Sequence, residues 1–557
     1  MLRLDRARVY DPVQGWRGQS RSLFIENGRM VADPGPQATV ERVIDLEDAV
    51  VMAGGIDIHS HIGSGKVNLA RTLMPHDHAR TERAAALENG AWRHGGSGQA
   101  TPTSWIAGYR YAEMGYTAAF EPAMLPVNAR ATHYTLADTP VIDKGAYVLL
   151  GNDDLFLRLL ARGAEPQRLA DYVAWMLART RSLAVKVVNP GGISAFKFNQ
   201  RALDLDQAHA YYGVTPRQVL RALARAVHDL GVPHPLHVHT SNLGVPGNVA
   251  TTLATMEAAE GLPLHLTHVQ FHSYGKEGPR GFSSAAEAIA EAVNRQPNLS
   301  IDVGQVMFGQ TATASGDTMA QYANRRHAHP HAWTCIDIEC EAGCGVVPFR
   351  YRDRNFVHAL QWAIGLELFL RVRDPWRIFL TTDHPNGAPY TVYPQLMRLL
   401  MDRGYRNRML DAVHPEVAAH SALRGLDREY TLEEIAIVTR AGPARSLGLR
   451  DRGHLAPGAV ADLVAYRDDP DREAMFARPS HVFKDGELIV RDGRLLAAPQ
   501  GATLALEPEF DAAIEAQIAE HYARHLSLRA EHLAVGAQEL ADYGGRAPLI
   551  LPCTRHG

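Results

Sequence analysis

Eight short apolar segments, each rich in β-branched residues, recur through the middle of this 557-residue chain. They lie at Ile56–His61, Thr117–Glu121, Ala146–Leu150, Ala184–Asn189, Leu236–Thr240, Leu264–Val269, Leu299–Val303 and Ile378–Asp383. Segments with helical periodicity separate them; the clearest begins at Thr215-Pro216 and ends before Gly231. Strands that alternate with helices build parallel sheets. The pattern therefore predicts an α/β fold, a (β/α)₈ TIM barrel over residues 54–445.

The two regions that flank the predicted barrel are also rich in strands. The first fifty residues alternate apolar and polar positions and carry an Asn27-Gly28 turn signal. Similar segments follow the barrel at Gly458–Tyr466 and His481–Val490. We therefore expect residues 1–53 and 446–500 to form one small β-sandwich domain.

Residues 501–557 are expected to form a C-terminal helical extension. An apolar stripe with i, i+4 spacing runs along it at Phe510, Ile514, Ile518, Tyr522 and Leu526. Two interpretations remain open: the helix packs on its own barrel, or it contacts another protein chain.

Charge and composition exclude several classes of protein. The formal net charge of −4 excludes a strongly basic nucleic-acid binder. No apolar run is long enough to span a bilayer, and the N-terminus is charged where a signal peptide is apolar. The four cysteines are too few for a disulfide framework, and the spacing of Cys335, Cys340 and Cys344 matches no standard metal pattern. We expect a cytoplasmic protein that binds neither nucleic acid nor membrane.

The strongest chemical signal is the motif that ends the first predicted strand. His59 and His61 are two residues apart, so an extended backbone places both imidazoles on one face. Two imidazoles at the C-terminal end of a barrel strand can bind one divalent metal ion. The glycines at 54, 55 and 63 and Asp57 make the motif far more specific than an isolated His-x-His.

Lysine is rare in this chain, because only six of the 57 Lys and Arg residues are lysines. One of them, Lys186, lies in the middle of an apolar predicted strand, where a bare ammonium is costly. Reaction with CO₂ would convert it into a carbamate, an anionic ligand that bridges two metal ions and that arginine cannot form. The alternative is a buried salt bridge.

Three later strand ends supply further candidate ligands. His237 or His239 on the fifth strand, and His265 or His268 on the sixth, can face a metal, and the positions nearer the C-terminal ends favour His239 and His268. Asp383 ends the eighth strand, where a carboxylate can bind metal and accept a proton from water. The alternative for Asp383 is a helix N-cap.

This constellation resembles the amidohydrolase superfamily. The resemblance implies two divalent ions, expected to be zinc, held by His59, His61, His239, His268, Asp383 and an N6-carboxylated Lys186. It assigns catalysis to Asp383 and Lys186. The segments Pro457–Val464 and Thr439–Leu449 are similar to the return strand and closing helix of that superfamily.

Longer motifs are similar to the family of A subunits of formylmethanofuran dehydrogenases, which has a bacterial formyltransferase/hydrolase branch. They surround His59, Lys186, His268 and Asp383 and extend to Lys66, His272 and Asn386. The resemblance implies hydrolysis of a formylmethanofuran-type carrier to formate, in a complex with a formyltransferase and other subunits. The scarcity of lysine favours the bacterial branch. Candidate substrate-binding residues are Asn189, Asn242, His272 and His384.

Two other functions remain open from the sequence. Dihydroorotases and hydantoinases, which hydrolyse cyclic amides, share the same metal scaffold. The second alternative is not an enzyme: the chain would be a non-catalytic subunit of the same complex, with a role in assembly.

Overall fold

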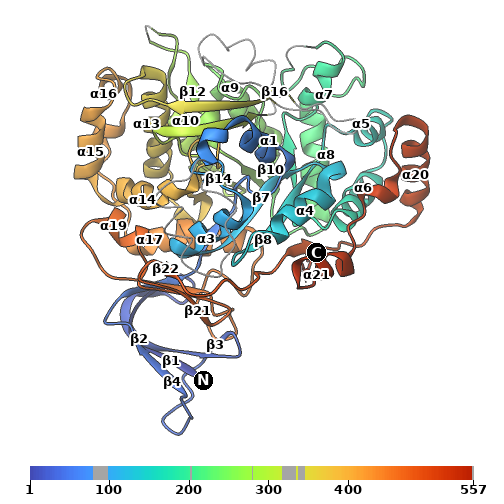
Figure 1. The fold of residues 1–557 in the computed structure, drawn as a ribbon. Helices are drawn as coiled ribbons and strands as arrows, with labels where there is room; N and C mark the ends of the chain where they lie inside the picture. The colour runs from blue at the N-terminus through green and yellow to red at the C-terminus, as the bar shows by residue number, and fades with distance from the viewer. Residues whose placement is uncertain (79–97, 201–202, 279, 316–333, 336–344, 555–557) are drawn as a thin grey trace.

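Eight parallel strands form the inner barrel of the computed structural model, which describes residues 1–78, 98–200, 203–278, 280–315, 334–335 and 345–554 (Figure 1). In chain order they are β6 (Gly55–Asp57), β7 (Tyr116–Met124), β8 (Asp143–Leu149), β9 (Ala184–Val188), β10 (Leu236–His239), β11 (Leu264–Leu266), β14 (Leu299–Asp302) and β18 (Ile378–Phe379). The barrel closes where Ser60 bridges His384 in parallel register and the backbone N–H of His61 donates to the His384 carbonyl at 2.8 Å. Each predicted strand overlaps one of these eight, so the predicted barrel is confirmed.

Helices surround the barrel (Figure 1). The main ones are α3 (Ser104–Glu113), α4 (Ala129–Ala137), α6 (Pro166–Arg179), α8 (Pro216–Asp229), α9 (Val249–Ala258), α10 (Ala286–Arg295), α13 (Phe356–Arg371) and α14 (Tyr393–Met401). Helix α8 begins as the sequence predicts, because Thr215 and Gln218 form a capping box in front of Pro216. Its buried residues include Val219, Leu223 and Val227, the predicted apolar stripe.

Both ends of the chain contribute to one nine-stranded sheet below the barrel (Figure 1). Its strands are β1 (Leu2–Asp11), β2 (Trp16–Glu26), β3 (Arg29–Val31), β4 (Arg42–Asp45), β5 (Val50–Ala53), β19 (Leu463–Tyr466), β20 (His481–Lys484), β21 (Glu487–Arg491) and β22 (Arg494–Leu495). β5 joins the two ends, because it pairs with β1 in parallel and with β19 antiparallel. Leu4, Val9, Leu463 and Phe483 belong to a hydrophobic cluster of this sheet alone. The β domain built from both ends is therefore confirmed, while its boundaries at residues 53, 446 and 500 stay a prediction.

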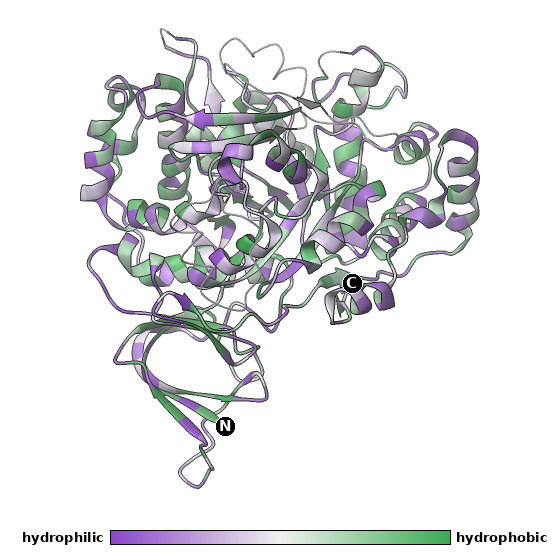
Figure 2. Cartoon of the chain, in the orientation of Figure 1, coloured by the Kyte–Doolittle hydropathy of each residue, from purple (hydrophilic) through white to green (hydrophobic). Residues whose placement is uncertain are grey.

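The C-terminal extension packs against the barrel helices. It consists of β23 (Leu504–Leu506), α20 (Ala513–His525), α21 (Ala537–Gly544) and β24 (Leu549–Leu551). Ile514 and Ile518 of α20 are fully buried, and Arg168 and Arg179 of α6 hydrogen-bond to the same helix. Figure 2 shows hydrophilic residues elsewhere on α20. The apolar stripe thus packs on its own barrel, the first of the two interpretations.

A small antiparallel sheet lies between β14 and α13 in the chain. It is formed by β15 (Gly309–Ser315), β16 (Thr334–Cys335) and β17 (Gly345–Tyr351). Ala312 and Val346 pack on Ala70 and Met74, which belong to or follow α1 (Gly65–Leu73). The thiols of Cys340 and Cys344 lie outside the described residues.

In the parts of the chain that the structure describes, no helix has both the length and the apolar character needed to cross a membrane.

Candidate metal centre

The two histidines of the His-x-His motif follow β6 and are held by different carboxylates. Asp57 anchors the strand end, because it accepts the hydroxyls of Tyr111 and Tyr393 at 2.7 and 2.5 Å and the backbone N–H of His59 at 3.1 Å. Nδ1 of His61 lies 3.0 Å from Oε1 of the buried Glu121 in β7. Glu121 thus fixes the ring of His61, whereas Asp57 holds the backbone at His59, and Nε2 of both rings faces Asp383.

Glu121 is held by the turn that follows His61. Its Oε2 accepts backbone N–H groups of Ile62, Gly63 and Ser64 at 2.9 to 3.0 Å. Burial alone would raise the pKa of Glu121, but His61 and these donors outweigh burial and lower it. Glu121 is therefore a carboxylate that fixes the orientation of His61.

Asp383 lies where the first and last strands meet. Its Oδ1 is 2.8 Å from Nε2 of His59 and 3.3 Å from Nε2 of His61. Burial raises the pKa of Asp383, while His61 and Lys186 oppose this rise. One carboxylate oxygen thus converges with two imidazole nitrogens.

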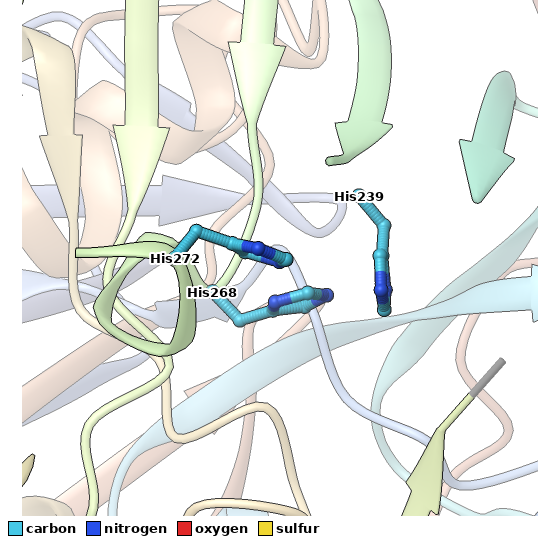
Figure 3. Close-up of side chains that lie close together, drawn as sticks. All are labelled: His239, His268 and His272. Carbon is cyan, nitrogen blue, oxygen red and sulfur yellow. The ribbon is translucent and has the colours of Figure 1, made fainter. Parts of the chain in front are cut away.

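Three further histidines converge on the other side of the site. Figure 3 shows His239 from the end of β10 and His268 and His272 from the segment after β11, with their rings gathered together. The ring centroids of His239 and His268 are 4.6 Å apart, and His272 lies 5.1 and 5.3 Å from them. One ring nitrogen from each of the three lies within 4.8 Å of the others.

Lys186 projects into the same space from β9. Its side chain lines the pocket and only 2% of the residue is exposed. Burial lowers the pKa of its amine to about 8. Among the described residues no carboxylate is within ion-pair distance of this amine, so the structure does not contain the buried salt bridge considered as the alternative.

These side chains form part of the wall of one pocket. Predicted ligands in the wall are His61, Lys186, His239, His268 and Asp383. His59 lies beneath them and is fully buried. The rest of the wall is formed by Lys66, Ala123, Val188, Leu243, Phe271, Thr313, Tyr351 and Asn386.

Sequence reasoning missed several of these wall residues. Lys66 belongs to the motif that begins at Gly54, and the rarity of lysine was an available signal. Asn386 follows Asp383 by three residues and belongs to the motif that surrounds Asp383. Tyr351 and Thr313 come from the small antiparallel sheet, whose position no local pattern predicts.

The four candidate substrate-binding residues are not in the pocket wall. Asn242 donates to Thr251, and the ring of His384 packs on Tyr390. Asn189 is buried after β9, and His272 lies behind His239 and His268. Their assignment to substrate binding stays a prediction.

The remaining strand histidines lie below the pocket, deeper in the barrel. His237 stacks on His265, with ring centroids 4.8 Å apart, and both are fully buried. His265 contacts Oδ2 of Asp302 through Nε2 at 3.0 Å. Where the sequence left two choices on each strand, the structure places His239 and His268 at the pocket.

Two of the expected ligands have left-handed backbones. His268 has φ of 36° and Asp383 has φ of 51°, a region that L-residues rarely adopt. The close approach of Gly304 accommodates the first of them, since a Cβ there would lie 2.4 Å from that of His268. Such conformations cluster at functional sites, because surrounding structure must stabilise them.

The donor atoms fit a divalent metal. Four buried atoms have no hydrogen-bond partner among the residues that the structure describes: Nε2 of His59, Nε2 of His239, Nδ1 of His268 and Oδ1 of Asp383. Burial holds the pKa of all three of these histidines well below the usual 6.5, so their imidazoles are neutral, as metal ligation requires. Buried lone pairs that converge without donors are costly unless a cation lies between them.

A parallel barrel that gathers histidines, a lysine and an aspartate at its C-terminal strand ends has the arrangement of a barrel hydrolase. The model of the amidohydrolase family matches residues 42–497, and the chain belongs to this family.

Within that family, the chain is similar to the A subunit of the formyltransferase/hydrolase complex Fhc of Methylorubrum extorquens. The two are 47% identical over 529 residues, which is 94% of each chain. Protein FwdA of Methanocaldococcus jannaschii is 38% identical over 95% of each chain. A chain in the crystal structure of the Methylorubrum extorquens complex with methylofuran superimposes with a TM-score of 0.93 at 43% identity, covering 99% of this chain and all of that one.

Proposed function

We propose that this protein hydrolyses the formyl amide of a formylated methanofuran-type carrier to formate and the free carrier amine. The observation that carries the proposal is the cluster of unpartnered ligand atoms from His59, His239, His268 and Asp383 around the pocket. The similarity to a protein chain of a complex crystallised with methylofuran supports the same substrate class. A formyl amide presents one carbonyl oxygen and one leaving nitrogen to such a pocket.

Two divalent metal ions, which we expect to be zinc, complete the proposed site. His59, His61 and Asp383 would hold one ion, and His239 and His268 the other. Lys186 lies in the same pocket, and its buried amine, with a pKa lowered to about 8, is a ready nucleophile for CO₂. The resulting N6-carboxylysine would supply an oxygen ligand to each ion. Divalent ions in such a site activate water at neutral pH and polarise the carbonyl that is attacked.

Asp383 carries the proton in the proposed mechanism. Its carboxylate accepts a proton from the attacking water and delivers it to the amide nitrogen, because an unprotonated amine anion is a poor leaving group. His61, anchored by Glu121, keeps Asp383 in place through the 3.3 Å contact to Oδ1. Thr313 and Tyr351 of the small antiparallel sheet form part of the pocket wall.

We further propose that the protein works in a complex with a formyltransferase and other subunits. Its relative with 47% identity is named as one of the subunits of such a complex. The apolar stripe of α20 is already covered by α6, so this stripe is not the surface that partners contact.

The experiment is to purify the protein with its native partners and to measure formate release from the formylated carrier. Dihydroorotate and hydantoin serve as alternative substrates, and the metal content is measured on the same sample. Formate release with about two zinc ions per chain is the expected result.

Two results would contradict the proposal. Turnover of dihydroorotate without formate release would assign the pocket to cyclic amides. A chain that copurifies with its partners but holds no metal and turns over neither substrate would have a role in assembly only.

A further inference from the structure

A row of three buried histidines runs from the candidate metal centre down into the barrel. Nδ1 of His59 lies 2.9 Å from Nε2 of His237, and Nδ1 of His237 lies 2.9 Å from Nε2 of His234. The row ends at Ser446, whose backbone carbonyl lies 3.1 Å and whose hydroxyl oxygen lies 3.2 Å from Nδ1 of His234. All three histidines are fully buried.

The carbonyl at the end of the row determines where every proton lies. A carbonyl only accepts, so its contact with Nδ1 of His234 requires a hydrogen on that nitrogen, and the hydroxyl of Ser446, which can donate or accept, then accepts from the same N–H. A neutral imidazole has one N–H, hence Nε2 of His234 accepts from Nδ1 of His237. By the same step Nε2 of His237 accepts from Nδ1 of His59. Nε2 of His59 is then left with a lone pair, and this is the atom that faces Asp383.

The groups beside the row are consistent with this direction. The hydroxyl of Thr267 lies 2.5 Å from Nδ1 of His59 and can accept a share of the same N–H. Oδ2 of Asp302 lies 3.9 Å from Nδ1 of His59 and 4.0 Å from Nε2 of His237 and is hydrogen-bonded to His265 instead.

We propose that His237 and His234 are positioning residues that keep the proton of His59 on Nδ1 and thereby reserve Nε2 for the metal. The carbonyl of Ser446, at the end of the row away from the metal centre, determines which nitrogen of each histidine donates and which accepts. The inference rests on the proposed metal centre but not on the identity of the substrate.

The test compares zinc affinity, measured by competition with a chelator and without substrate, across matched variants. His237→Phe removes both ring nitrogens and should weaken zinc binding about 10–100-fold, the usual effect of losing such a partner. His237→Gln offers a carbonyl toward His59 and an N–H toward His234, so it should restore most of the affinity. His234→Phe should weaken binding less than His237→Phe, because His237 remains in contact with His59.

His133→Phe is the control for replacing a buried histidine. His133 donates to the carbonyl of Thr180 at 2.9 Å, as His234 does to Ser446, but lies on α4 and outside the row. Its zinc affinity should match that of the wild type. Neutron diffraction from the zinc-loaded, deuterated protein should show deuterium on Nδ1 of His59, His237 and His234.

The outcomes separate this inference from the proposed metal centre. Equal zinc affinity in the wild type and His237→Phe, or equal losses in His237→Phe and His237→Gln, would overturn the positioning role alone. Deuterium on Nε2 of His237 or His234 would do the same. A wild-type protein that binds no zinc would overturn both the centre and the row's role in it.

Discussion

In the proposed mechanism, Asp383 both binds metal and transfers the proton. Replacing it by asparagine keeps the shape but removes the charge and the proton acceptor. We expect Asp383→Asn to lower the rate of formate release about 10²–10⁴-fold, the usual contribution of a general acid–base. Metal content must be measured in parallel, because Oδ1 contacts two of the expected ligands.

Asp411→Asn is the matched control for this change. Asp411 is exposed and pairs with Arg424 at the surface, so its variant should retain full turnover. Near wild-type turnover by Asp383→Asn at full metal occupancy would place the proton transfer on another residue, with His384 and His272 the next candidates.

A second prediction at the scale of the residue concerns Lys186. Arginine keeps the positive charge but cannot form a carbamate, so Lys186→Arg should lose both metal and activity. Protein prepared with ¹³C-bicarbonate should show a carbamate carbon resonance in the wild type and none in this variant. Lys276→Arg, on the exposed loop after β12 (Tyr274–Gly275), should behave like the wild type. A fully active, metal-loaded Lys186→Arg protein would rule out the carbamate.

The sequence indicated which residues are candidate ligands, but it could not predict the backbone beyond the ends of the strands that carry them. His59 and His61 were placed on one face by assuming an extended strand, yet β6 ends at Asp57. β11 and β18 likewise end before His268 and Asp383, whose left-handed backbones turn the chain. Local residue types indicate which side chains converge, but the tertiary contacts that stabilise such turns cannot be derived from periodicity.

At the scale of the element, the eight barrel strands were predictable because buried parallel strands are continuously apolar. The position of α20 was not predictable, because its apolar stripe fits the surface of a barrel or of a second protein chain equally well. Helix α6 decides this: Arg168 contacts Gln517 and the carbonyl of Ala513, and Arg179 contacts Glu515. These are contacts between residues far apart in sequence, which no local pattern contains.

The buried face of α20 should therefore stabilise the isolated chain. Ile518→Ala removes a fully buried side chain and should lower the free energy of unfolding by about 2–5 kcal/mol. Urea denaturation of the chain without partners measures this, with Glu520→Ala on the exposed face as the control. An unchanged midpoint would show that α20 is not docked on the barrel.

At the scale of the whole molecule, a buried charge network joins the barrel to the β domain. Lys484 of β20 lies 2.9 Å from Asp462 and 3.2 Å from Asp143 of β8, which also pairs with Arg452 at 2.6 Å. Burial alone would raise the pKa of Asp143, but Lys484 and Arg452 outweigh burial and hold that pKa below its usual range. The network thus stabilises the junction only while Asp143 is ionised.

Lys484→Met should lower the free energy of unfolding by about 3–5 kcal/mol at pH 7, since it leaves buried carboxylates without their partner. A folded-state pKa below the unfolded value means that this stability is present above about pH 4 and is lost as the pH falls further. The difference in free energy of unfolding between the wild type and Lys484→Met should accordingly become smaller below about pH 4. Urea denaturation as a function of pH measures this difference. The control Lys276→Met, at an exposed position, should have the same free energy of unfolding as the wild type.

The strand β5 also has a consequence for how the protein is made. On the ribosome, Val50–Ala53 emerges long before its antiparallel partner Leu463–Tyr466 is synthesised. Until then the growing chain exposes an unpaired edge of four apolar residues, the kind of surface that chaperones bind and that promotes aggregation. A message truncated before Tyr466 therefore yields an aggregating product rather than a barrel with partial activity, even though every expected metal ligand has already been translated.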